Sequence, residues 1–139
     1  MNFDRTIHTD VKVITPSASY TATQAGVNII DTIAAESGTI FIISAAWTSG
    51  TFTPVVKDGN DSGLSDGAAV DDSFLVGSSL SVAPEAAAAI TAANQVKKIG
   101  YIGKKRYLTV DLTGASTPSA FVGVIIVLQM LKDTINQSA

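Results

Sequence analysis

The feature that most constrains the fold is a series of short segments rich in Val, Ile, Thr, Phe and Tyr, separated by turn-forming residues. Apolar runs of this length and composition are typical of β-strands. The candidate strands are residues 11–15, 27–33, 39–48, 52–57, 73–77, 96–102, 106–113 and 120–131, with turn signals at 37–38, 48–51, 58–63 and 113–119. The pattern predicts an all-β fold, an antiparallel jelly-roll sandwich of about eight strands.

One segment departs from the strand pattern. Residues 83–95 are rich in alanine, and Pro84 suits the first position of a helix. An extended loop packed on a neighbour fits the same residues, so we expect at most one short helix. The 139 residues are expected to form a single jelly-roll domain, 1–139, with polar residues 1–10 as an extended N-terminal arm.

The composition limits the environment of the chain and the chemistry it can perform. Only 15% of residues are charged while 46% are hydrophobic, which favours a protein whose surface is partly covered inside an assembly. The absence of Cys excludes thiol chemistry, disulfides and Cys-ligated zinc. The longest apolar run, residues 120–131, is well short of the roughly 20 residues that span a bilayer, so it is interpreted as a buried strand and no membrane partner is expected.

A cluster of positive charge stands out in a chain whose net charge is -3. We interpret residues 96–102 and 106–113 as a hairpin around a Gly-Lys-Lys turn, with the basic side chains at one tip and on one polar face. They either keep an edge strand soluble or form an electrostatic docking surface, because six carboxylates and no Lys or Arg lie between Asp58 and Glu85. The cluster comprises Lys97, Lys98, Lys104, Lys105 and Arg106.

Ligand and catalytic motifs do not match this sequence well. Gly100 and Gly103 lack the spacing of a phosphate-binding loop, and the pI of about 4.8 speaks against nucleic acid. The segment 58–63 begins like a calcium loop, but its twelfth position is Ala69, so a turn is expected. His8 is the only histidine, and no nucleophile motif accompanies it; no enzyme, cofactor or metal site is expected.

The resemblance to a known family comes from three stretches of the chain. They are "VKKIGYIGKKRYLTVDLTGAST", "TSGTFTPVVKDGNDSG" and the opening "MNFDRTIHTDVKVITPSASYTATQAGVNIID". These stretches resemble small head proteins of tailed bacteriophages, and the length and the Ala, Ser, Thr and Gly content resemble capsid cement proteins. The matching motif positions are Gly100, Tyr101, Gly103, Lys105, Arg106 and Tyr107.

The resemblance implies a cement, or decoration, protein without catalytic residues. Such a protein is made in the host cytoplasm, binds the outer surface of an icosahedral phage head and bridges major capsid protein subunits. Partners would be the major capsid protein and itself, with a homodimer favoured and a trimer as the second choice, and neither nucleic acid nor membrane. The alternative is a virion receptor-binding or carbohydrate-binding jelly-roll module. Candidate interface residues are Lys97, Lys98, Lys104, Lys105, Arg106, Tyr101 and Trp47.

Overall fold

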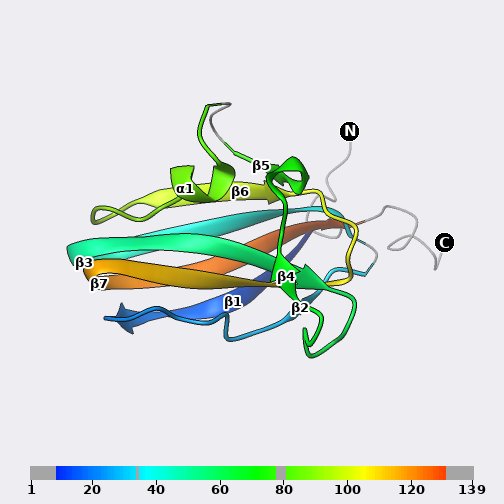
Figure 1. The fold of residues 1–139 in the computed structure, drawn as a ribbon, viewed down its shortest axis with the longest axis horizontal. Helices are drawn as coiled ribbons and strands as arrows, with labels where there is room; N and C mark the ends of the chain where they lie inside the picture. Colours follow the sequence, from blue (N-terminus) through cyan, green and yellow to red (C-terminus); the bar gives the residue numbers. More distant parts are fainter. Residues whose placement is uncertain (1–8, 34, 78–80, 131–139) are drawn as a thin grey trace.

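The computed structural model describes residues 9–33, 35–77 and 81–130, which form one antiparallel hydrogen-bonded sheet (Figure 1). The strand order is β1-β7-β3-β6-β5, with β2 paired to β7 and β4 paired to β3. A short helix, α1, and one 3-10 turn, Asp72–Phe74, complete the described elements. Their bounds are β1 Thr9–Tyr20, β2 Ile30–Asp31, β3 Ala35–Gly59, β4 Ala68–Ala69, β5 Leu75–Val76, α1 Pro84–Ala87, β6 Val96–Tyr101 and β7 Tyr107–Met130.

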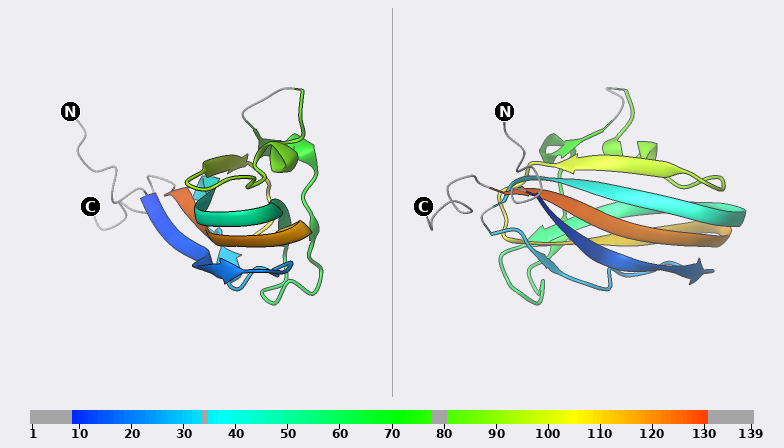
Figure 2. Two further views of the ribbon diagram at one scale, coloured as in Figure 1. Left: turned by 90° about the vertical axis from the view of Figure 1, so that its left-hand side faces the viewer. Right: turned by 180° about the vertical axis from the view of Figure 1, so that it is seen from behind.

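A long two-stranded ribbon organises the sheet. The strands β3 and β7 pair from Ala35 opposite Met130 to Gly59 opposite Tyr107, and the register shifts between Ser44 and Thr51. There the ribbon turns back on itself, with Gly50 at φ +69° and its partner strand carrying two more residues of positive φ, at 116 and 117. The result is two stacked layers (Figures 1 and 2).

Each long strand therefore belongs to both layers. The first layer contains β1, the C-terminal half of β7, the N-terminal half of β3, β6 and β5. The second contains β2, the N-terminal half of β7, the C-terminal half of β3 and β4. The prediction of an all-β antiparallel sandwich with at most one short helix is confirmed. The described sheet has seven strands rather than about eight, because 39–48 and 52–57 are one strand, as are 106–113 and 120–131.

The core lies between the layers and follows the two-residue period of a strand. In β3 and β7, away from the bend and the start of β3, the side chains at even positions face inward and are mostly buried. The apolar run 120–131 forms the C-terminal part of β7, as expected of a buried strand. The largest fully buried side chains are Phe52, Ile14, Ile40, Ile42, Ile90, Ile99, Leu108, Leu112, Ile126, Leu128, Val56 and Val110.

Three sequence expectations differ from the structure. The hairpin of residues 96–102 and 106–113 is wrong: β6 pairs with β3 and β5, whereas β7 pairs with β1, β2 and β3. Residues 102–106 instead cross from one layer to the other. Of the segment 27–33, only Ile30–Asp31 is a strand. Residues 1–8 of the expected arm lie outside the described residues, while residues 9 and 10 already belong to β1.

Helix is limited to single turns in the described residues. The segment 83–95 forms only α1, and Ala88 and Ile90 after it are buried against the sheet. None of the helices in the described ranges is long and apolar enough to cross a membrane.

Candidate binding surface

The two lysines of β6 point to opposite sides of the first layer. Lys98 stands opposite Phe41, on the side away from the core, whereas Lys97 stands opposite Ile42, which is fully buried. Adjacent residues of a strand alternate between faces, so the expected single polar face does not form. Neither lysine makes an ion pair with any residue that the structure describes.

Tyr101 and Lys105 are bound to a buried carboxylate. The Tyr101 hydroxyl donates to Asp58 Oδ2 at 2.7 Å, and Lys105 Nζ lies 3.5 Å from Asp58 Oδ1. Burial, and then the hydrogen bond to Asp58, raise the pKa of Tyr101 above its ordinary value. Gly103 explains the close approach, since a Cβ there would lie 2.5 Å from the Tyr101 ring. These residues hold the 102–106 crossing to the second layer.

Arg106 is likewise engaged within the fold. Its Nε and Nη2 donate to the two carboxylate oxygens of Asp31, each at 2.9 Å. The hydrogen bonds from Arg106 are the largest cause of a lowered pKa at Asp31. The guanidinium also lies 5.1 Å from the centroid of the Tyr107 ring. Of the three basic residues of the crossing, Lys104 alone has no ion pair within the described chain.

The acidic segment is also satisfied internally. Asp66 accepts the backbone N–H groups of residues 60 and 61, and Asp61 accepts those of residues 63 and 65, all at 2.9–3.1 Å. These bonds lower the pKa of both carboxyls. The segment 58–63 is therefore a side-chain-stabilised turn, and no cluster of three potential metal ligands occurs in the described ranges.

Trp47 lies where the ribbon bends. Its indole N–H donates to the Gly50 carbonyl oxygen at 3.0 Å, and its ring packs, partly buried, against the core. The side chain therefore supports the bend.

An extended apolar surface covers the first layer on the side away from the core. We call it the outer face, and its rows follow from the strand register. Val11, Val13, Ile43, Val96 and Phe121 are 38–64% exposed. The outer face consists of Val11, Val13, Thr39, Phe41, Ile43, Val96, Lys98, Gly100, Phe121, Ile125 and Val127, among which Lys98 is the sole ionisable side chain. The polar residues Ser17, which covers Gly123, and Ser19 lie at its margin.

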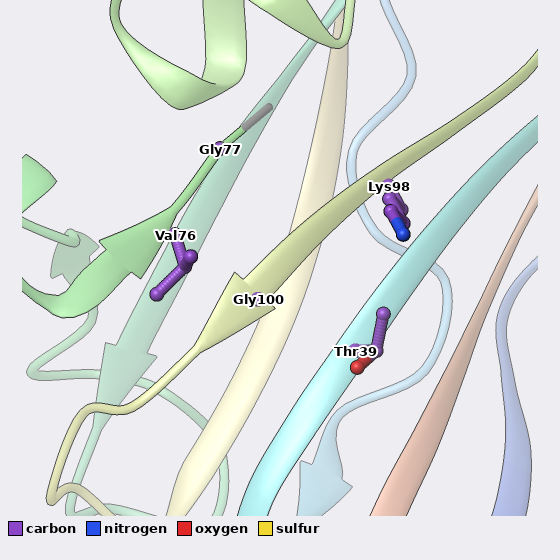
Figure 3. A pocket seen from close by; sticks show the side chains of 5 residues that line it. All are labelled: Thr39, Val76, Gly77, Lys98 and Gly100. Atoms are coloured by element: carbon purple, nitrogen blue, oxygen red, sulfur yellow. The ribbon is translucent and has the colours of Figure 1, made fainter. Parts of the chain in front are cut away.

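A depression of about 460 Å³ lies at the β5 and β6 end of the outer face (Figure 3). Gly100 lacks a side chain there, and Thr39, Val76, Gly77 and Lys98 line the remaining sides. A bulky partner side chain could enter this depression beside the ammonium group of Lys98. It offers shape and one cation.

Sequence reasoning missed the outer face as a site, although the signal was present. The runs "TIFII" and "FVGVIIV" are apolar at successive positions, so both faces of their strands carry apolar side chains. Such runs are typical of strands covered on both sides. In this fold only one side faces the core, and the other side remains exposed.

Comparisons with known proteins identify a fold and no family. No protein family matches the sequence, and no curated protein does. The crystal structure of YomS, an SPBc2 prophage-derived protein, aligns with a TM-score of 0.52 and 14% identity over 86% of this chain and 93% of that chain. A structure reported with Bacillus endospore appendages, described as disulfide-linked pili, aligns with a TM-score of 0.44 and 17% identity over 89% of this chain and 88% of that chain. The likeness to YomS shows a shared fold.

Proposed function

We propose that this protein is a non-enzymatic structural component of a bacteriophage particle, a cement protein that binds the outer surface of the head and bridges major capsid protein subunits. The outer face is the observation that carries the proposal. Four neighbouring strands present apolar side chains to solvent with only Lys98 charged among them. Exposed apolar surface of this extent marks an interaction site on a soluble protein.

The size of the outer face suits a contact that is repeated many times. Four strands about 4.8 Å apart and about eight residues long give an area of roughly 500 Å². A stable interface between two proteins buries about 800 Å² on each side. One outer face therefore supports only a modest affinity, and many copies on a symmetric shell would convert such contacts into stability through avidity.

Two further observations support a phage particle. YomS, which shares the fold, is a prophage-derived protein. The motif that resembles phage head proteins contains Tyr101, Gly103 and Arg106, whose contacts hold the crossing between the layers. The motif therefore consists partly of residues that support the fold.

The charges available to a partner differ from those expected in the sequence. Lys105 and Arg106 are paired with carboxylates of the fold, whereas Lys97, Lys98 and Lys104 have no ion pair among the described residues. Lys98 is the one of these that stands within the outer face. An acidic side chain of the capsid protein next to the depression at Gly100 would complement it.

Binding to purified, expanded phage heads tests the proposal. Wild-type protein should co-sediment with the heads at a fixed copy number for each capsid subunit. Introducing a charge at Val96 or Ile43, as Val96→Asp or Ile43→Asp, should lower occupancy at least tenfold, because a carboxylate on the outer face would be desolvated in the contact. Val27→Asp is the matched control, since Val27 is 57% exposed but lies outside the outer face.

Two results would contradict this function. Wild-type protein that leaves the heads unoccupied excludes a cement role, and equal occupancy by Val96→Asp and Val27→Asp excludes the outer face as the contact. Binding to a glycan array without affinity for heads would favour the receptor-binding or carbohydrate-binding module instead.

A further inference from the structure

The strand β1 forms one edge of the first layer, and part of its backbone has no partner among the described residues. It pairs with β7 along one side. On the other side, Asn28 donates from Nδ2 to the Val13 carbonyl at 3.0 Å and from its backbone N–H to the Ile14 carbonyl at 2.9 Å. No described residue bonds this edge between Thr9 and Lys12.

The backbone groups of Val11 point to this open edge. In an antiparallel strand, alternate residues direct both their N–H and their C=O to the same side. The Val13 carbonyl accepts Asn28 from outside the sheet, so Val11 and Thr9 direct their groups outward as well. The next carbonyl, of Ile14, also faces Asn28, because the register shifts between Val13 and Thr15.

A hydrogen bond on the far side of the layer independently gives the same direction for the backbone groups of Val11. The Ser44 N–H donates to the carbonyl of Gln95, the residue before β6. The backbone N–H and C=O groups of even residues in β3 therefore point to β6, and those of odd residues point to β7. In β7, the backbone groups of odd residues then form hydrogen bonds with β3, and those of even residues form hydrogen bonds with β1. Ile126 accordingly bonds Lys12 across the ladder, which leaves Val11 unbonded to β7.

The charges on this edge are self-complementary. The sequence of the edge is Thr9-Asp10-Val11-Lys12-Val13, with opposite charges at equal distances from Val11. Asp10 and Lys12 are partly exposed, and Lys12 Nζ lies 3.3 Å from Asp10 Oδ2. A second β1, antiparallel about a two-fold axis at Val11, places Asp10 opposite the partner's Lys12 and Lys12 opposite the partner's Asp10.

We propose that two copies of this protein pair through the edges of β1, with Val11 hydrogen-bonded to the partner's Val11. The Asp10 and Lys12 pairs are then of the non-hydrogen-bonded kind, whose side chains approach most closely. Axes at Thr9 or Val13 would not bring Asp10 of one copy opposite Lys12 of the other. A charge pattern that complements itself suits an isologous contact, in which the same patch of both copies meets.

The structure also limits the length of the pairing. Asn28 already bonds the carbonyl groups of Val13 and Ile14, so pairing about Val11 extends no further than Val13, whose N–H alone is left for the partner strand. The side chains of Val11 and Val13 belong to the outer face, so the two outer faces become continuous across the dimer. This inference does not depend on the proposed function, because the dimer forms in solution without a capsid.

Charge exchange tests the pairing with the full-length protein. Sedimentation equilibrium of wild-type protein should give twice the 14.3 kDa monomer mass at micromolar concentration. Asp10→Lys alone and Lys12→Asp alone each place like charges at two symmetric contacts and should raise the dimer dissociation constant at least tenfold. The double variant Asp10→Lys with Lys12→Asp restores opposite charges and should dimerise as the wild type does.

A cross-linking test locates the contact without changing a charge. The chain has no Cys, so Val11→Cys introduces a single thiol at the two-fold axis. A hydrogen-bonded antiparallel pair separates its Cα atoms by about 5.5 Å, within the range of a disulfide. Val11→Cys should form a disulfide-linked dimer under mild oxidation. Val96→Cys is the control, since Val96 is 64% exposed on the opposite edge of the same layer, against 59% for Val11.

The outcomes separate this pairing from other modes of association. A wild-type monomer up to 100 μM overturns the proposal. A dimer in which the double charge variant is as weak as the single variants, or in which Val96→Cys links faster than Val11→Cys, overturns it as well. Circular dichroism of each variant reports whether the fold is intact, and Val11→Pro should give a folded monomer because the Val11 N–H is outside the ladder.

Discussion

Replacing Tyr101 with Phe should destabilise the fold by about 2 kcal/mol. The ring stays and fills the same volume, so the change removes only the hydroxyl that donates to Asp58 at 2.7 Å. A hydrogen bond to a charged group contributes roughly 1.5–3 kcal/mol, and Asp58, 6% exposed, cannot replace this donor with bulk water. Lys105 remains as a partner at 3.5 Å, which keeps the expected cost within that range.

Thermal and urea unfolding followed by Trp47 fluorescence measures this change, since Trp47 is the single tryptophan and packs on the core. For a chain of this length, about 2 kcal/mol lowers the melting temperature by roughly 6 °C. Tyr107→Phe is the matched control, because no described residue hydrogen-bonds the Tyr107 hydroxyl, and we expect less than about 0.5 kcal/mol. Equal effects of the two substitutions would refute the role assigned to the Asp58 contact.

Three other substitutions test local features of the fold by the same unfolding assay. Gly50→Ala should cost at least about 2 kcal/mol, because φ is +69° and the new Cβ would lie 2.6 Å from a backbone oxygen of β7; a change below 0.5 kcal/mol would contradict the bend. Gly103→Ala should displace the Tyr101 ring, so adding Tyr101→Phe to it should be nearly neutral. If the two substitutions lower the free energy of unfolding additively, the predicted displacement is wrong. Glu85→Gln tests the pKa of Glu85, which burial raises above 4.5. Native Glu85 holds its proton more tightly than the same residue in the unfolded chain, so the free energy of unfolding falls as pH rises through the window just above 4.5. Glutamine keeps the acceptor for the Val56 N–H and should remove that fall, while an unchanged pH profile would contradict the assignment.

The strands were predictable from sequence because local composition and turn residues favour them, but the long ribbon was not. The turn signals at 48–51 and 113–119 were expected to separate strands, yet the ladder continues through both. The two bends occur opposite each other, so β3 and β7 turn together and each remains the partner of the other. The pattern of residues within one strand does not show which strand it pairs with through a bend.

The same limitation explains the error in the basic cluster. Neighbouring strands in sequence usually pair, which favoured a hairpin of 96–102 with 106–113. Here β3 is the partner of both strands, and residues 102–106 connect two layers. Asp31 and Asp58, distant in sequence, then lie beside Arg106 and Lys105. The sequence shows how many basic residues the cluster contains, but tertiary contacts determine which of them can bind a partner.

The outer face and the edge of β1 reinforce each other as parts of one assembly. A single outer face of roughly 500 Å² is small for a stable contact, whereas two faces joined at β1 approach 1,000 Å². Linked sites can exceed the affinity of either site by 10²–10⁴-fold when both engage together.

Asp10 and Lys12 turn away from the outer face, so Asp10→Lys should weaken head binding only through loss of the dimer. Val96→Asp should weaken head binding while the dimer persists. If Asp10→Lys instead binds heads normally without dimerising, and Val96→Asp also binds heads normally, the two surfaces are separate and head binding belongs to another part of the chain.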